Sequence, residues 1–77
     1  MKKAIQQDTL EALISTQALR EARAVRVDGG WALEGRIGLQ WRSVRSRREP
    51  LRVWRSLTAL ERFCTGIGLP QLLVELG

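Results

Sequence analysis

The feature that most constrains the fold is an Asp28-Gly29-Gly30 turn between two runs of alternating residues. Valines alternate with an arginine before the turn, and a run that starts with a tryptophan alternates after it. A two-residue hairpin turn needs positive φ at both central positions, and Asp-Gly and Gly-Gly pairs adopt this backbone at little cost. The sequence therefore predicts an antiparallel strand pair over residues 23–27 and 31–37, and hence a sheet in this 77-residue chain.

Other runs extend this sheet. Strands are predicted over residues 39–45, 51–55 and 71–76, with Gly38 as a turn or bulge and residues 46–50 as a polar loop. One face of strand 31–37 is predicted to be buried, namely Trp31, Leu33, Gly35 and Ile37. In strand 39–45, Leu39 and Trp41 share one face and Gln40 and Arg42 the other. In the last strand, the residues expected to face the core are Leu72, Val74 and Leu76.

Two helices flank these strands. An apolar stripe formed by Leu10, Leu13 and Ile14 predicts a helix over residues 9–16, with an alternative end near Arg23. A second helix is predicted to begin at a cap formed by Ser56 or Thr58 and to end at Gly66 or Gly68. The resulting order is α-β-β-β-β-α-β. We expect a single α+β domain over residues 1–77, an antiparallel sheet with both helices on one face, and a loose segment over residues 1–6.

The composition argues against catalysis and against a bound metal or cofactor. The chain has no histidine and no tyrosine, which removes the commonest general base and the commonest metal ligand. Its eight carboxylates are scattered, and its single cysteine, Cys64, lies on the apolar stripe of the second helix and is predicted to be a core residue. No apolar run is long enough to span a membrane or to form a signal peptide, so a cytoplasmic location is expected.

The positive charge is concentrated in one segment. The formal net charge is +5, and residues 36–55 contain seven arginines and one acid, with two tryptophans among them. Because the arginine fork binds phosphate at two points, this pattern is typical of a nucleic-acid surface that contacts mainly the backbone. The candidate contacts are Arg36, Arg42, Arg45, Arg47, Arg48, Arg52 and Arg55, with Trp41 and Trp54 as candidate base-stacking residues. Arg36, Arg42 and Arg52 are expected to project from the open side of the sheet.

Other interpretations of the same residues stay open. The arginines could dock an acidic protein partner or a second copy of the chain, or they could form a solvated face with no ligand. Trp41 and Trp54 could equally pack half-exposed beneath the helices. A domain this small gains stability from a partner, so a homodimer is a further expectation.

Four stretches of the chain resemble a known family. They are Ile5-Gln6-Gln7-Asp8-Thr9-Leu10-Glu11-Ala12-Leu13, Gly29-Gly30-Trp31-Ala32, Leu51-Arg52-Val53-Trp54-Arg55-Ser56-Leu57 and residues 63–69 before the final strand. Together they are similar to the small ParC-type partition-associated proteins of broad-host-range plasmids and integrating elements, over roughly residues 5–76. The resemblance implies a non-enzymatic accessory protein of plasmid maintenance that contacts DNA or a DNA-bound partition or replication protein.

Overall fold

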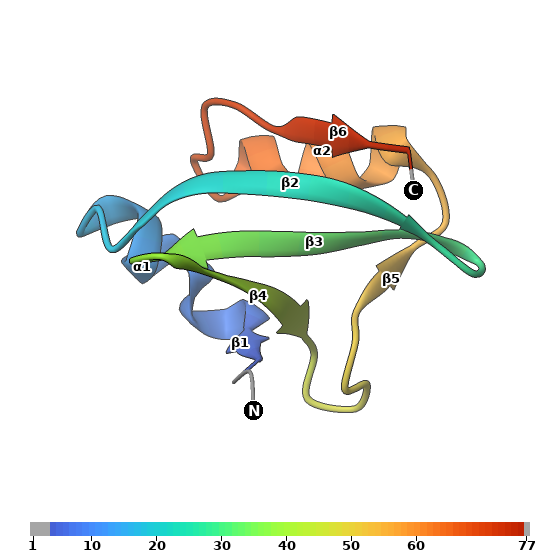
Figure 1. Ribbon diagram of the computed structural model, residues 1–77, viewed down its shortest axis with the longest axis horizontal. Helices are drawn as coiled ribbons and strands as arrows, with labels where there is room; N and C mark the ends of the chain where they lie inside the picture. The colour runs from blue at the N-terminus through green and yellow to red at the C-terminus, as the bar shows by residue number, and fades with distance from the viewer. Residues whose placement is uncertain (1–3, 77) are drawn as a thin grey trace.

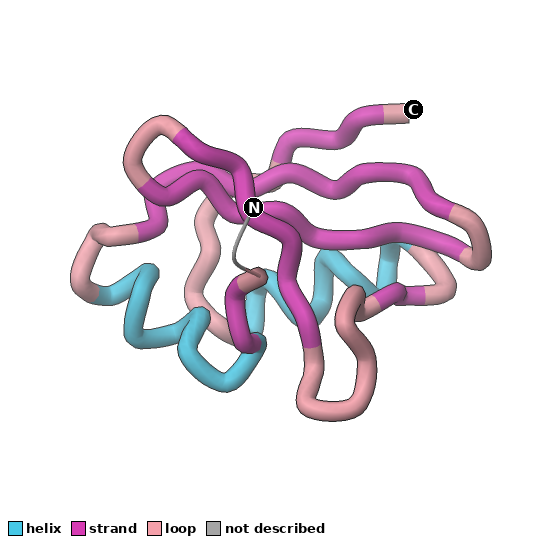
Figure 2. Tube along the Cα trace, turned by 60° about the horizontal axis from the view of Figure 1, so that its bottom comes forward, coloured by secondary structure: helices cyan, strands magenta, loops and turns pink. Residues whose placement is uncertain are grey.

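The computed structural model describes residues 4–76. In chain order the elements are β1 (Ile5–Gln6), the 3-10 helix η1 (Gln7–Thr9), α1 (Leu10–Ser15), β2 (Leu19–Val27), β3 (Gly30–Ile37), β4 (Gln40–Arg45), β5 (Val53–Trp54), α2 (Leu57–Gly66) and β6 (Leu73–Glu75). The strands form one sheet in the order β1-β4-β3-β2-β6, and β5 pairs with the start of β3 beside β4. Both helices lie on one side of the sheet (Figures 1 and 2). No helix among residues 4–76 is both long and apolar enough to cross a bilayer.

The α+β class and the turn at residues 28–30 are confirmed. Val27 pairs with Gly30, and the antiparallel β2–β3 ladder continues to Leu19 opposite Ile37. The fully antiparallel sheet is wrong, because β1 runs parallel to β4 and β6 runs parallel to β2. The parallel direction of β6 follows from α2, which connects β5 to β6. A strand that follows a helical crossover re-enters the sheet in the same direction as the strand before the helix.

Several predicted boundaries on the N-terminal side are also wrong. Residues 4–6 are not loose, because Ile5 is buried and pairs with Val44; residues 1–3 lie outside the described residues. The first helix ends at Ser15, because Gln17 adopts a positive φ of 63° that reverses the chain, and β2 starts at Leu19 instead of residue 23. Leu39 belongs to the β3–β4 turn and is exposed.

On the C-terminal side, the strand predicted over residues 51–55 shrinks to Val53–Trp54. The predicted cap of α2 is Ser56, whose Oγ accepts a hydrogen bond from the Ala59 N–H at 3.1 Å. The predicted burial of the last strand is wrong in part. Val74 and Leu76 are exposed because β6 is the outer strand of the sheet, whereas Leu72 packs against the core.

The core lies between the sheet and the helices. Its most completely buried side chains come from four different elements, and they are Leu10, Leu33, Val44 and Leu60. Gly35 is buried among them. The packing is so close that a Cβ at this position would lie 2.5 Å from a Leu19 methyl group. The expected inner face of β3 is confirmed by this packing, with Trp31 and Ile37 partly buried against the core. The other face of the sheet carries no helix and is the open face below (Figure 2).

Candidate nucleic-acid interface

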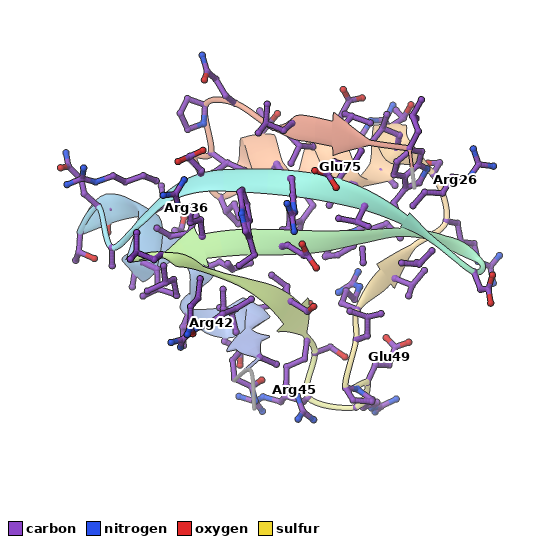
Figure 3. The ribbon with its side chains drawn as sticks, viewed as in Figure 1. Arg26, Arg36, Arg42, Arg45, Glu49 and Glu75 are labelled. Atoms are coloured by element: carbon purple, nitrogen blue, oxygen red, sulfur yellow. The ribbon has the colours of Figure 1, made fainter. Side chains whose placement is uncertain are left out.

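The open face of the sheet is a network of paired charges. The ladder sets Arg23 of β2 opposite Glu34 of β3, and their Nε and Oε1 atoms are 2.6 Å apart. Arg23 also reaches Glu75 of β6 at 3.4 Å. Two residues along the ladder, Arg36 lies opposite Glu21 and contacts it at 3.0 Å. Figure 3 shows Arg36 and Glu75 over this face. The two arginines therefore already have carboxylate partners.

Trp41 lies on the same open face, since it pairs with Arg36 across the β3–β4 ladder. The guanidinium of Arg23 stacks over its ring at 4.1 Å from the centroid. A base could stack on this side of the half-buried ring only by displacing Arg23. Trp41 therefore serves to pack the arginine in this structure.

Trp54 lies in the core. It is 5 % exposed, its ring centroid is 5.0 Å from that of Phe63, and the Arg52 guanidinium lies 4.6 Å from the ring. The sequence left open base stacking and half-exposed packing beneath the helices; Trp54 does pack against α2, but it is buried and not half-exposed. Trp54 has no exposed face on which a base could stack.

The expectation that Arg36, Arg42 and Arg52 share the open face is wrong. Arg42 pairs with the buried Gly35, and directly opposed residues of an antiparallel ladder share a face, so Arg42 belongs to the helix side. Its Nε atom is buried and has no hydrogen-bond partner among the described residues. Arg52 also lies on the helix side, where it covers Trp54.

The other predicted arginines, except Arg55, gather at the end of β4 and in the connection from β4 to β5. We call residues 45–52 the arginine loop; its basic residues are Arg45, Arg47, Arg48 and Arg52. Among the arginines that form ion pairs, Arg47 has the most exposed side chain, at 86 %. Arg48, the next residue, is also exposed. Arg55 is exposed but lies beyond β5, next to Gly30, away from this cluster.

Hydrogen bonds hold the arginine loop in one shape. Within it, the Ser46 N–H donates to the Glu49 carbonyl at 3.1 Å, and the Glu49 N–H donates back to the Ser46 hydroxyl at 3.0 Å. The Arg52 N–H donates to the Val44 carbonyl at 3.0 Å and closes the loop at its base. The Arg45 Nε donates to the Ser46 carbonyl at 3.2 Å. The loop is thus held in shape by its own hydrogen bonds, without a ligand, although residues 46–52 form no helix or strand.

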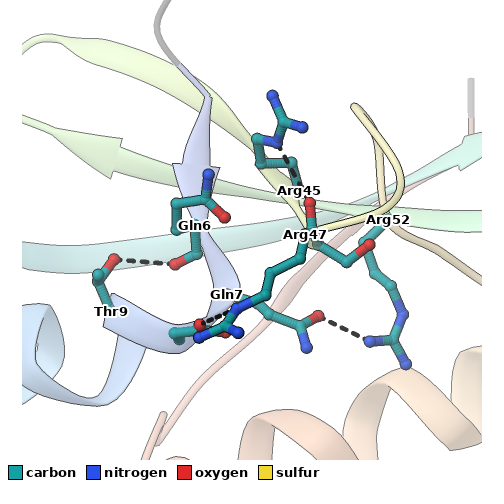
Figure 4. A network of polar contacts seen from close by, with 8 residues as sticks. Gln6, Gln7, Thr9, Arg45, Arg47 and Arg52 are labelled. Carbon is teal, nitrogen blue, oxygen red and sulfur yellow. Dashed lines mark hydrogen bonds and ion pairs between the residues drawn. The ribbon is translucent and has the colours of Figure 1, made fainter.

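Two residues of η1 support the loop from outside, and sequence reasoning did not identify them. Gln7 accepts a hydrogen bond from Arg52 at 2.7 Å (Figure 4), and Asp8 pairs with Arg47 at 3.2 Å. These contacts span 45 and 39 residues of sequence, so no local spacing could have indicated them. Asp8 and Glu49 offset two of the four arginine charges of the cluster, which keeps a positive excess.

Cys64 offers no reactive thiol. Burial, together with the nearby Glu61 carboxylate, raises the pKa of the Cys64 thiol from 9.0 to about 11, so the thiol stays protonated at neutral pH. Within residues 4–76, no three His, Cys, Asp or Glu side chains come together in a group that could hold a metal ion.

Comparison with known proteins finds no family model, no curated protein and no solved structure that matches this chain.

Proposed function

We propose that this chain is a non-enzymatic accessory protein of plasmid or mobile-element maintenance that contacts the phosphate backbone of nucleic acid, DNA in the first place, through the arginine loop. The observation that carries the proposal is the exposure of Arg47 and Arg48 on a loop already fixed by hydrogen bonds. The plasmid context comes from the resemblance to ParC-type partition-associated proteins.

The chemistry of the loop suits phosphate. A guanidinium donates two parallel N–H bonds to phosphate oxygens, and a loop ordered in advance loses less conformational entropy on binding. The hydrogen bond from Arg52 to Gln7 holds the Arg52 guanidinium at the base of the loop, while Arg47 and Arg48 are exposed to solvent. Such contacts position a duplex without reading its bases, so the expected binding is weakly dependent on sequence.

The proposed surface is smaller than the nine residues that the sequence suggested. Arg36 is paired on the open face, Arg42 lies on the helix side, and Trp54 is in the core. The ion-paired groups of the open face are three acids, Glu21, Glu34 and Glu75, and two bases, Arg23 and Arg36, so this face offers no net attraction for phosphate. The surface that supports the proposal is the arginine loop, in which Arg47 and Arg48 are exposed and Arg45 and Arg52 are half-buried at the base.

The test is fluorescence anisotropy of labelled duplex and single-stranded oligonucleotides at about 50 and about 200 mM salt. We expect binding that weakens steeply with salt. The double variant Arg47→Ala, Arg48→Ala should bind more weakly and lower the log–log salt slope by up to about 2, since each lost phosphate contact removes about 0.9. The matched control is Arg20→Ala, Arg62→Ala, which removes the same charge from exposed positions outside the loop.

Two results contradict the proposal. Absence of binding at about 50 mM salt would exclude direct contact and leave the loop to an acidic protein partner, such as a DNA-bound partition or replication protein. Equal weakening in both double variants would mean that only the net charge matters and that the loop is not a site.

A further inference from the structure

The outer edge of the sheet at β6 carries exposed apolar side chains. Among the described strands, β6 pairs only with β2, and its other edge has no strand beside it. The large apolar residues Leu73, Val74 and Leu76 are 58 %, 44 % and 76 % exposed. Unpaired backbone groups beside apolar side chains are a template for adding another strand.

The register of β6 assigns these residues to the two faces of the sheet. Leu73 lies beside Arg23 and Val74 beside Ala24 in the parallel ladder, so Leu73 belongs to the open face and Val74 to the helix side. By alternation, Leu72 and Leu76 accompany Val74 on the helix side. The same short segment therefore carries three apolar residues, at every second position, on one face.

We propose that a second copy of this chain pairs with β6 in antiparallel fashion, about a two-fold axis at Val74, to give one continuous sheet across the dimer. In this register Val74 meets Val74 of the second copy, and Leu72 meets Leu76 of the second copy. A slip by one residue would set open-face residues against helix-side residues, which an antiparallel ladder does not allow. The proposal does not depend on nucleic-acid binding.

Neighbouring registers of the same parity are less favourable. Moving the axis to Glu75 would set the two Glu75 carboxylates directly opposite each other, and like charges in this position are destabilising. Moving the axis to Leu73 would set Leu76 opposite Pro70, which lies before the strand and has no N–H to donate to the ladder. The axis at Val74 pairs the three apolar helix-side residues with one another, within residues 72–76 of both copies.

A hollow beside Leu72 favours a second copy over an unrelated strand. It has a volume of about 200 Å³, lies between α2 and the segment before β6, and is lined by Glu61, Cys64, Thr65, Leu69, Pro70, Gln71 and Leu72. Because Leu76 of the second copy would lie opposite Leu72, it comes to the rim of this hollow. The chain thus supplies both the protruding leucine and the space that receives it, which is the self-complementarity that a two-fold interface requires.

Sedimentation velocity from about 5 to about 200 µM tests the interface, a range that covers a small strand-to-strand contact. We expect the wild-type chain to reach twice the 8.7 kDa of a monomer as the concentration rises. Val74→Lys should remain monomeric, because it places two ammonium groups on the two-fold axis. The matched control Leu39→Lys, at a 90 % exposed position in the β3–β4 turn, should dimerise like the wild type.

A mixing experiment tests the register itself. Val74→Lys and Val74→Glu should each be monomeric, and their equimolar mixture should regain the dimer mass, because lysine and glutamate then face each other on the axis. Far-UV circular dichroism identical to that of the wild type establishes that both variants are folded. A wild-type monomer at the highest concentration, a dimeric Val74→Lys, or a mixture that stays monomeric would each overturn the proposal.

Discussion

At the scale of single residues, Cys64 is the titratable group whose environment differs most clearly from water. The residue is 3 % exposed, and burial raises the pKa of its thiol from 9.0 to about 11. The position was predictable, because the residue falls on the apolar stripe of the second helix. The unfolded thiol ionises near pH 9.0, whereas the folded thiol keeps its proton up to about pH 11.

This difference predicts how stability depends on alkaline pH. Below pH 9.0 both states are protonated at Cys64, so the thiol adds no pH dependence; between 9.0 and about 11 the unfolded state loses its proton first, and the free energy of unfolding falls. The chain has no tyrosine, and its lysines are Lys2 and Lys3, so few other groups titrate there. Urea unfolding followed by tryptophan fluorescence should show this decline, and Cys64→Ala should flatten it. An unchanged slope in Cys64→Ala would contradict the assignment.

The sequence also left open whether two single residues, Trp41 and Trp54, are exposed or buried. Whether Trp41 and Trp54 are exposed depends on strand faces, and β5 is only two residues long, which is too short for alternation to indicate a face. Trp54 is fixed instead by its pairing with Trp31 and its contact with Phe63. Both are tertiary contacts, which single-residue patterns do not encode.

At the scale of elements, the pairing of β5 with β3 depends on Gly30. This glycine has a φ of 150°, and a Cβ there would collide with the Trp54 carbonyl. Its neighbour Gly29 has a φ of 86°, but a Cβ at that position would meet no atom within 4 Å. The two glycines of one turn thus differ in what an added methyl group encounters.

Alanine substitutions should separate these two costs. Gly29→Ala pays only for the left-handed backbone, so we expect a loss of about 1 kcal/mol in the free energy of unfolding. Gly30→Ala adds a collision that pushes β5 away from the sheet, and we expect about 2 to 4 kcal/mol. Guanidinium unfolding of the two variants provides the comparison. Equal losses would mean that β5 moves aside without cost and that its pairing with β3 contributes little.

The elements that the sequence predicted correctly are those set by local signals. The β2–β3 turn rests on Asp28-Gly29-Gly30, and α2 begins where Ser56 caps it. The start of β2 was missed because Gln17 takes a positive φ, which its residue type does not indicate. β1 was missed because its two residues form a strand only through Val44, 39 positions along the chain from Ile5.

At the scale of the whole molecule, Arg23 joins four strands of the sheet. From β2 it pairs with Glu34 of β3 and Glu75 of β6, and it stacks over Trp41 of β4. Once the turn sets Val27 opposite Gly30, counting back along the hairpin places Arg23 opposite Glu34, so this half of the network was within reach of the sequence. The contact with Glu75 was not, because it requires the parallel docking of β6.

Removing this hub should weaken the sheet and leave the arginine loop intact. Arg23→Met leaves Glu34, whose side chain is 19 % exposed, without its cation and uncovers Trp41, so we expect a loss of about 2 kcal/mol in the free energy of unfolding. Glu34→Gln should also destabilise the chain, and the double variant should lose less than the sum of the two, because the pair is already broken in each single variant. Urea unfolding of the three variants measures this coupling.

The same variants distinguish the two faces of the molecule as binding surfaces. Folded Arg23→Met should bind an oligonucleotide as the wild type does, because the loop arginines lie at the other end of β4 and keep their supports Gln7 and Asp8. If Arg23→Met instead abolished binding while its stability stayed unchanged, the open face would be the surface that meets phosphate, and its ion pairs would have to open when the ligand binds. The stability and binding of this one variant together therefore decide whether the charges of the sheet hold the fold together or serve a partner.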